Sequence, residues 1–150
     1  MPHALAPLSL KLGLLERVVL EKDIAKFSYA CMSNAKWRKL FSVVNESNLE
    51  LANCVWKLVG EPEPKNGFVP DYEQLGEDYV GDCGALNGPF EFKRIEWLKL
   101  PARIGYKEYE KAPTQFKTQD LSNLTEQLAS LGSFEIEEKS EGITVYGYKP

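Results

Sequence analysis

A chain of 150 residues with 43% hydrophobic and 27% charged residues can bury a core without disulfides or metals, which excludes a disordered or low-complexity protein. Its net charge of -4 and pI of about 5.2 argue against nucleic acid as the main partner. We expect one domain over residues 1–150.

The N-terminal third shows helical periodicity. The apolar stretch Leu8 to Leu20 is interrupted by charged residues, so it fits neither a membrane span nor a signal peptide, and we expect a cytoplasmic protein. Two helical segments are predicted within residues 1–32, which we interpret as a helical N-terminal extension. Their apolar positions are Leu8, Leu12, Leu15 and Val19, then Ile24, Phe27 and Cys31.

A stronger helix signal follows Ser33, whose hydroxyl suits a helix N-cap. Its apolar residues fall at i, i+3, i+4 and i+7, namely Trp37, Leu40, Phe41 and Val44. Residues 49–59 then predict a strand, although periodicity alone also allows a buried helix. Residues 61–89 contain four prolines, five glycines and seven acids, which predicts irregular structure with one short strand near Tyr79 and Val80.

Residues 90–100 predict the central strand, with Ile95 and Trp97 on one face and Phe92, Leu98 and Leu100 on the other. A basic, tyrosine-bearing connection over residues 103–111 precedes a helix over residues 121–131, and the segments 134–137 and 143–148 predict a β-hairpin. We therefore predict an α+β fold, with N-terminal helices and one C-terminal helix packed on a mainly antiparallel sheet that ends in a C-terminal β-hairpin. The expected core includes Trp37, Phe41, Ile95, Trp97, Leu124 and Leu128.

Few residues suit catalysis. His3 is the one histidine, near the N-terminus, and the three cysteines lack CxxC spacing, which favours reduced, inert thiols over a disulfide framework or a zinc site. We predict no catalytic residue, no metal and no cofactor.

The charge is distributed unevenly. Residues 61–92 contain one lysine and eight acids, which is typical either of a solvated loop or of a surface that attracts a basic partner. Tyr146 and Tyr148 should point together, away from Ile143 and Val145, and are either covered or part of a contact patch. The candidate partner-binding residues are Asp71, Tyr72, Glu73, Glu77, Asp78, Tyr79, Asp82, Tyr146 and Tyr148.

Two other functions remain open. The same carboxylates could serve a metal-dependent hydrolase, since acid-base and hard-cation chemistry need two carboxylates held close. A nucleic-acid-associated regulator would instead use cations with interleaved aromatic side chains. Its candidate residues are Lys93, Arg94, Lys99, Arg103, Lys107, Lys111, Trp97, Tyr106 and Tyr109.

Three short motifs resemble a family of small uncharacterised bacterial proteins that is known only as a domain of unknown function. They are Asn-x-Lys-Trp at Asn34 to Trp37, Ile-Glu-Trp at Ile95 to Trp97, and the terminal Tyr-Gly-Tyr-Lys at Tyr146 to Lys149. The resemblance covers roughly residues 33–150 and implies a bacterial source and a stand-alone domain, but no activity.

We expect a protein-binding module. The chain is small, it lacks a recognisable set of catalytic residues, and residues 61–92 are strongly acidic. The most concrete form is an immunity-type protein that neutralises a basic toxin domain, because complementary charge speeds the association of such pairs. The sequence does not fix the oligomeric state.

Overall fold

The computed structural model describes residues 13–47, 49–51, 53–84 and 88–150. Its helices are α1 (Leu14–Ala25), α2 (Asn34–Glu46) and α3 (Ser122–Leu131), with the 3-10 turns η2 (Tyr72–Gln74) and η3 (Phe92–Arg94). Its strands are β1 (Tyr29–Ala30), β2 (Cys54–Leu58), β3 (Lys65–Gly67), β4 (Tyr79–Val80), β5 (Phe90–Glu91), β6 (Ile95–Pro101), β7 (Arg103–Tyr106), β8 (Gln115–Thr118), β9 (Ile136–Lys139), β10 (Gly142–Tyr146) and β11 (Tyr148–Lys149). Each helix in these ranges is too short or too polar to span a bilayer.

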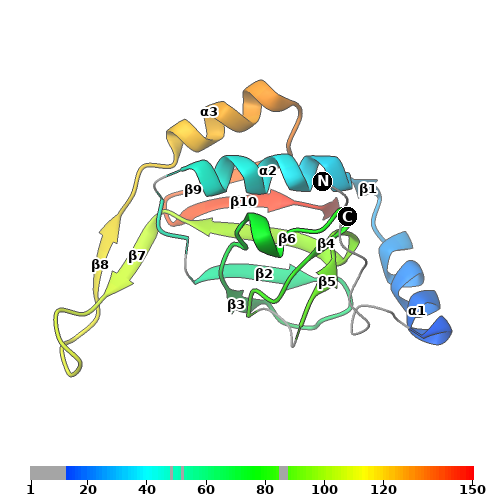
Figure 1. Cartoon of the computed structure of the whole chain (residues 1–150), viewed down its shortest axis with the longest axis horizontal. Helices are drawn as coiled ribbons and strands as arrows, with labels where there is room; N and C mark the ends of the chain where they lie inside the picture. Colours follow the sequence, from blue (N-terminus) through cyan, green and yellow to red (C-terminus); the bar gives the residue numbers. More distant parts are fainter. Residues whose placement is uncertain (1–12, 48, 52, 85–87) are drawn as a thin grey trace.

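A five-stranded antiparallel sheet lies at the centre of the fold, in the order β3-β2-β6-β10-β9. β6 is its middle strand, as predicted, but it begins only at Ile95. Residues 90–94, which the sequence places in the same strand, form β5 and η3 instead. α2 crosses one face of this sheet and α3 lies beside α2 (Figure 1). Three two-stranded sheets, β1–β11, β4–β5 and β7–β8, surround it. The predicted α+β fold and its C-terminal hairpin, β9–β10, are confirmed.

α2 is formed and positioned as the sequence predicts. The Ser33 hydroxyl accepts a hydrogen bond from the Lys36 backbone N–H at 3.2 Å, which caps the helix. The apolar stripe of α2 is buried against the sheet. The ring of Phe41 lies 5.8 Å from that of Trp37, 6.0 Å from that of Trp56 and 6.1 Å from that of Phe92, so one side chain joins α2 to β2 and to η3.

The N-terminal segment differs from the prediction. One helix, α1, stands where two were expected, and the chain then forms β1, whose Tyr29 pairs with Lys149 of β11. Cys31 lies outside any helix because its backbone N–H donates to the Gly147 carbonyl at 2.8 Å. Pairing with the C-terminal strand thus replaces the predicted second helix. Leu8 and Leu12 lie outside the described residues.

Trp97 lies on the sheet face that points away from α2, which we call the rear face. The sequence predicts Trp97 beside Ile95 in the core, and this prediction is wrong for Trp97. Ile95 is fully buried, whereas Trp97 is half-buried. The cause is a register shift in which Lys57 pairs with Trp97 but Leu58 pairs with Ile95. This bulge places one extra residue, Glu96, in β6 and turns Ile95 inward.

The segment 103–118 is a hairpin, β7–β8, where the sequence predicts only a connection; we call it the arm. It projects from one end of the sheet (Figure 1). A two-stranded hairpin is marginal alone, and cross-strand contacts support this one. The Arg103 guanidinium lies 3.9 Å from the centre of the Phe116 ring, and that ring covers Gly105, where a Cβ would lie 3.5 Å from it.

Truncating the side chains of Phe41 and Trp97 should distinguish the buried face of the sheet from the rear face, because the two variants should lose different amounts of unfolding free energy. Phe41→Ala should lower the free energy of unfolding by about 3–5 kcal/mol, because it leaves a cavity in a dry aromatic cluster. Trp97→Ala should cost less, because its ring is half-buried on the rear face. Urea denaturation measures both, and equal losses would contradict the assignment of the two faces.

Candidate functional site

Most of the predicted partner-binding residues lie in one segment, residues 71–82, which we call the acidic loop. It begins with η2, for which Asp71 is the N-cap. The Asp71 carboxylate accepts from the Glu73 backbone N–H at 3.1 Å, and the Gln74 side chain accepts from the Asp71 backbone N–H at 3.3 Å. This reciprocal capping box fixes the start of the loop locally.

Backbone contacts hold the acidic loop against α2 and η3. Arg38 of α2 donates to the Glu77 carbonyl, and the Phe92 backbone N–H donates to the Asp78 carbonyl at 2.9 Å. The Tyr72 hydroxyl donates toward Glu46 Oε1 at 3.1 Å and the Ser42 carbonyl at 3.2 Å, both on α2. Two backbone carbonyls and the Tyr72 hydroxyl therefore hold the acidic loop in place.

Tyr79 has a structural role within the loop. Its ring lies against Gly76, where a Cβ would overlap the ring, and its carbonyl accepts from the Gly76 backbone N–H at 2.9 Å. Tyr79 is half-buried, whereas the Tyr72 side chain is 54% exposed. Of the two predicted aromatic anchors, Tyr72 is the one that presents its ring to solvent.

The carboxylates of the acidic loop are exposed. Among the described residues, none of them lies within 4.0 Å of a lysine or arginine nitrogen, since every ion pair found uses a carboxylate outside residues 71–82. Asp71 and Asp82 also accept backbone hydrogen bonds, the latter from Gly84 at 3.1 Å. The five carboxylates are Asp71, Glu73, Glu77, Asp78 and Asp82.

Tyr146 and Tyr148 do not join this surface. Tyr146 lies on the rear face, because Val145 and Ile143 on the same strand are buried in the core. Tyr148 is engaged internally. Its ring stacks on Phe27 with centroids 5.3 Å apart, its hydroxyl donates to the Lys93 carbonyl at 2.8 Å, and burial raises the pKa of its phenol.

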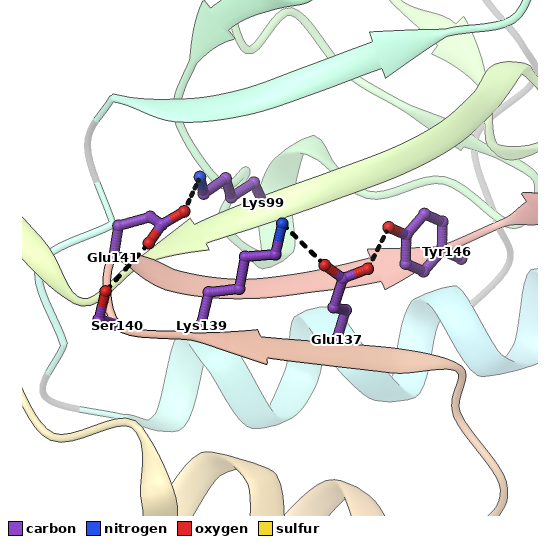
Figure 2. Close-up of polar contacts among 6 residues, drawn as sticks. All are labelled: Lys99, Glu137, Lys139, Ser140, Glu141 and Tyr146. Carbon is purple, nitrogen blue, oxygen red and sulfur yellow. Dashed lines mark hydrogen bonds and ion pairs between the residues drawn. The ribbon is translucent and has the colours of Figure 1, made fainter.

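The rear face carries a polar network around Tyr146 (Figure 2). The Tyr146 hydroxyl donates to Glu137 Oε2 at 2.8 Å, and Lys139 Nζ lies 2.9 Å from Glu137 Oε1. These hydrogen bonds, first from Lys139 and then from Tyr146, lower the pKa of Glu137. Burial and the Glu137 contact raise the pKa of Tyr146. Neighbouring Lys99 pairs with Glu141 at 3.3 Å, so opposite charges adjoin across this face.

Sequence reasoning missed Glu137, Lys139 and Trp97 as parts of a surface. The signal was present for Glu137, which lies on the polar side of the predicted strand 134–137. Lys139 falls in the predicted turn after that strand, whereas β9 in fact extends to Lys139. The signal was absent for Trp97, because the bulge at Glu96 reverses the alternation.

The described residues offer little geometry for catalysis. They contain no group of three or more His, Cys, Asp or Glu side chains arranged to hold a metal ion, so the hydrolase alternative gains no support. His3 lies outside the described residues. Cys54 is fully buried, and burial raises the pKa of its thiol to about 12, which suppresses the nucleophilic thiolate.

The cations proposed for nucleic-acid binding do not form one face. Lys93, Arg94 and Lys99 lie on η3 and β6 and pair with carboxylates at 3.0–3.7 Å. The remaining basic residues of that set lie in the arm. Three of these cations are already paired with carboxylates, and the other three lie apart from them in the arm. The nucleic-acid alternative is therefore weakened for these residues.

Comparison with known proteins gives one match. The model of a family described as "Family of unknown function (DUF6678)" matches residues 20–150. The match begins inside α1, earlier than the motifs from Asn34 onward indicate. Neither the curated proteins nor the solved structures contain a match to this chain.

The three thiols should differ in reactivity toward a disulfide reagent. At about pH 8, Cys31 should react in the native protein, because it is only partly buried. Cys54 and Cys83, which are fully buried, should react only after unfolding. Absorbance of the released thiolate counts the reacting groups, Cys31→Ser is the control that removes the native signal, and rapid native reaction of a second thiol would contradict this assignment.

Proposed function

This chain belongs to DUF6678, a family of unknown function, and we propose that it is a non-enzymatic protein-binding module that presents the acidic loop to a basic protein surface. The proposed partner is a basic toxin domain, which the chain neutralises as an immunity-type protein. The observation that carries the proposal is the set of five exposed carboxylates in residues 71–82 with no cation within 4.0 Å among the described residues.

Unpaired carboxylates act at longer range than paired ones. An adjacent cation cancels the field of a carboxylate beyond a few ångströms, as for Glu137 beside Lys139 at 2.9 Å. The field of the acidic loop extends about a Debye length, roughly 8 Å at physiological ionic strength. Such a field speeds the encounter with a basic protein and fixes its orientation.

The anchoring of the loop supports the same role. Arg38 and Phe92 bind the carbonyls of Glu77 and Asp78 and leave the carboxylates of both residues exposed. The loop is thereby ordered before a partner arrives, which lowers the entropic cost of binding. Tyr72 keeps its hydroxyl on α2 and exposes its ring, the arrangement of an aromatic anchor in a protein interface.

A toxin that acts on nucleic acid is the partner chemistry that this surface fits best. The active site of such an enzyme must bind phosphates and is therefore rich in lysine and arginine. An acidic surface covers such a site by occupying the same cations. Inhibition then requires no catalytic group on the inhibitor.

Neutralising the acidic loop should slow partner binding without affecting the fold. In the variant, the three aspartates become Asn, which can still cap backbone N–H groups, and the two glutamates become Gln. We expect the association rate with the partner captured from the source organism to fall about tenfold or more, with a flatter salt dependence. Stopped-flow kinetics with the purified partner measures both quantities.

The matched control removes the same charge elsewhere, at exposed glutamates outside the acidic loop. It changes Glu16, Glu50, Glu126, Glu135 and Glu138 to Gln. Equal association rates for the native chain and the acidic-loop variant, with equal salt slopes, would show that the carboxylates are merely solvated. Equal slowing by the control would show that net charge, rather than the acidic loop, sets the rate.

A further inference from the structure

The tip of the arm is an exposed, ordered turn with alternating charge. The Ala112 backbone N–H donates to the Tyr109 carbonyl at 2.9 Å, and the Tyr109 side chain is 65% exposed. Lys107 and Lys111 flank it, with Glu108 and Glu110 between, and all four are exposed without an ion pair among the described residues. An exposed tyrosine is one of the side chains that are enriched in protein interfaces.

A hollow of about 420 Å³ lies on α2, next to the end of α3. Its lining includes Arg38, Lys39, Ser42 and Glu46 of α2 and the exposed Leu131 of α3. Arg38 and Ser42 also contact the acidic loop, through the Glu77 carbonyl and the Tyr72 hydroxyl. The hollow and the acidic loop are therefore one continuous surface, with carboxylates on the loop and two cations on the helix.

The two surfaces are complementary in charge. The lysines of the arm tip match the unpaired carboxylates of the loop, and its glutamates match Arg38 and Lys39 of α2. The arm points away from α2 and η2, and its tip lies apart from both (Figure 1). The contact therefore requires two copies of the chain.

We propose that the arm tip of one copy, with Tyr109 leading, docks onto the hollow on α2 and the adjoining acidic loop of a second copy. Because the two halves of the contact are different surfaces, the association is head-to-tail and forms a ring or an open chain. The contact covers the acidic loop, so it competes with the basic partner. Only this competition with the basic partner rests on the proposed function.

Nucleic acid is the less favoured occupant of the arm. Arg103 covers Phe116 at 3.9 Å and Lys117 lies over Tyr106 at 5.9 Å from the ring centre, so two of the arm rings that could stack on bases already hold cations. Glu108 at the tip would also repel a polyanion. A discrete protein surface with charges of both signs fits better.

Two charge variants test the contact. The tip variant carries Lys107→Glu and Lys111→Glu, and the loop variant is the chain in which all five carboxylates of the acidic loop are neutralised to Asn or Gln. Each destroys one half of the contact and keeps the other, so each alone should be a monomer of 17.0 kDa. A mixture of the two should form a 1:1 complex of twice that mass, because one intact half of each remains. Light scattering after gel filtration measures the masses.

The native chain should associate more as its concentration rises and less as salt rises. Tyr109→Ala should weaken the association about tenfold or more, whereas Arg17→Glu with Lys22→Glu on α1 is the matched control and should leave it unchanged. The 1:1 complex also verifies that both variants are folded. A native chain that remains at 17.0 kDa at low salt up to millimolar concentration, or a mixture without a complex, overturns the proposal.

Two further measurements separate the outcomes. A labelled single-stranded oligonucleotide that binds the native chain but not the tip variant, without self-association, would assign the arm to nucleic acid and overturn the proposal. Binding of the basic partner tests the proposed function separately from the arm contact. The tip variant keeps its whole acidic loop, so it should still bind the basic partner even though it no longer self-associates.

Discussion

The burial of Phe41 is the constraint on which the rest of the structure depends. This ring is fully buried between Trp37, Trp56 and Phe92, so α2, β2 and η3 must meet at one point. Close packing of large rings leaves few alternative arrangements of these elements. Since η3 follows β5 and β5 pairs with β4, fixing η3 also fixes the end of the acidic loop against α2.

The same packing explains why the acidic loop can be both ordered and highly charged. Its order comes from carbonyls that accept hydrogen bonds from Arg38 and Phe92 and from Gly76, which leaves room for the ring of Tyr79. None of these contacts uses a carboxylate of Glu73, Glu77 or Asp78. Charge repulsion among the carboxylates is tolerated because solvent screens it, and the charges stay available to a partner.

The rear face and the acidic loop show two ways of placing charge on one small protein. On the rear face, Glu137 and Lys139 neutralise each other and Tyr146 completes the network. Such a face has a weak external field. The acidic loop carries carboxylates of one sign with no cation within ion-pair distance among the described residues, and a surface of that kind attracts a partner from a distance.

Features that depend on neighbours along the chain follow from the amino-acid sequence alone. These include the capped helix after Ser33, the central strand, the helix over residues 121–131, the closing hairpin and the exposed charge of residues 71–82. Local periodicity, capping and composition specify them without reference to distant residues.

The surfaces that these elements form depend on contacts between segments that are distant in the sequence. The bulge at Glu96 placed Trp97 outside the core, the C-terminal strand converted the segment at Tyr29 from helix to strand, and cross-strand contacts made residues 103–118 an arm. The tertiary structure also separated Tyr146 from the acidic loop by the thickness of the sheet. Pairing register and long-range backbone hydrogen bonds set these outcomes, and a local pattern contains no information about which distant strand will supply the partner.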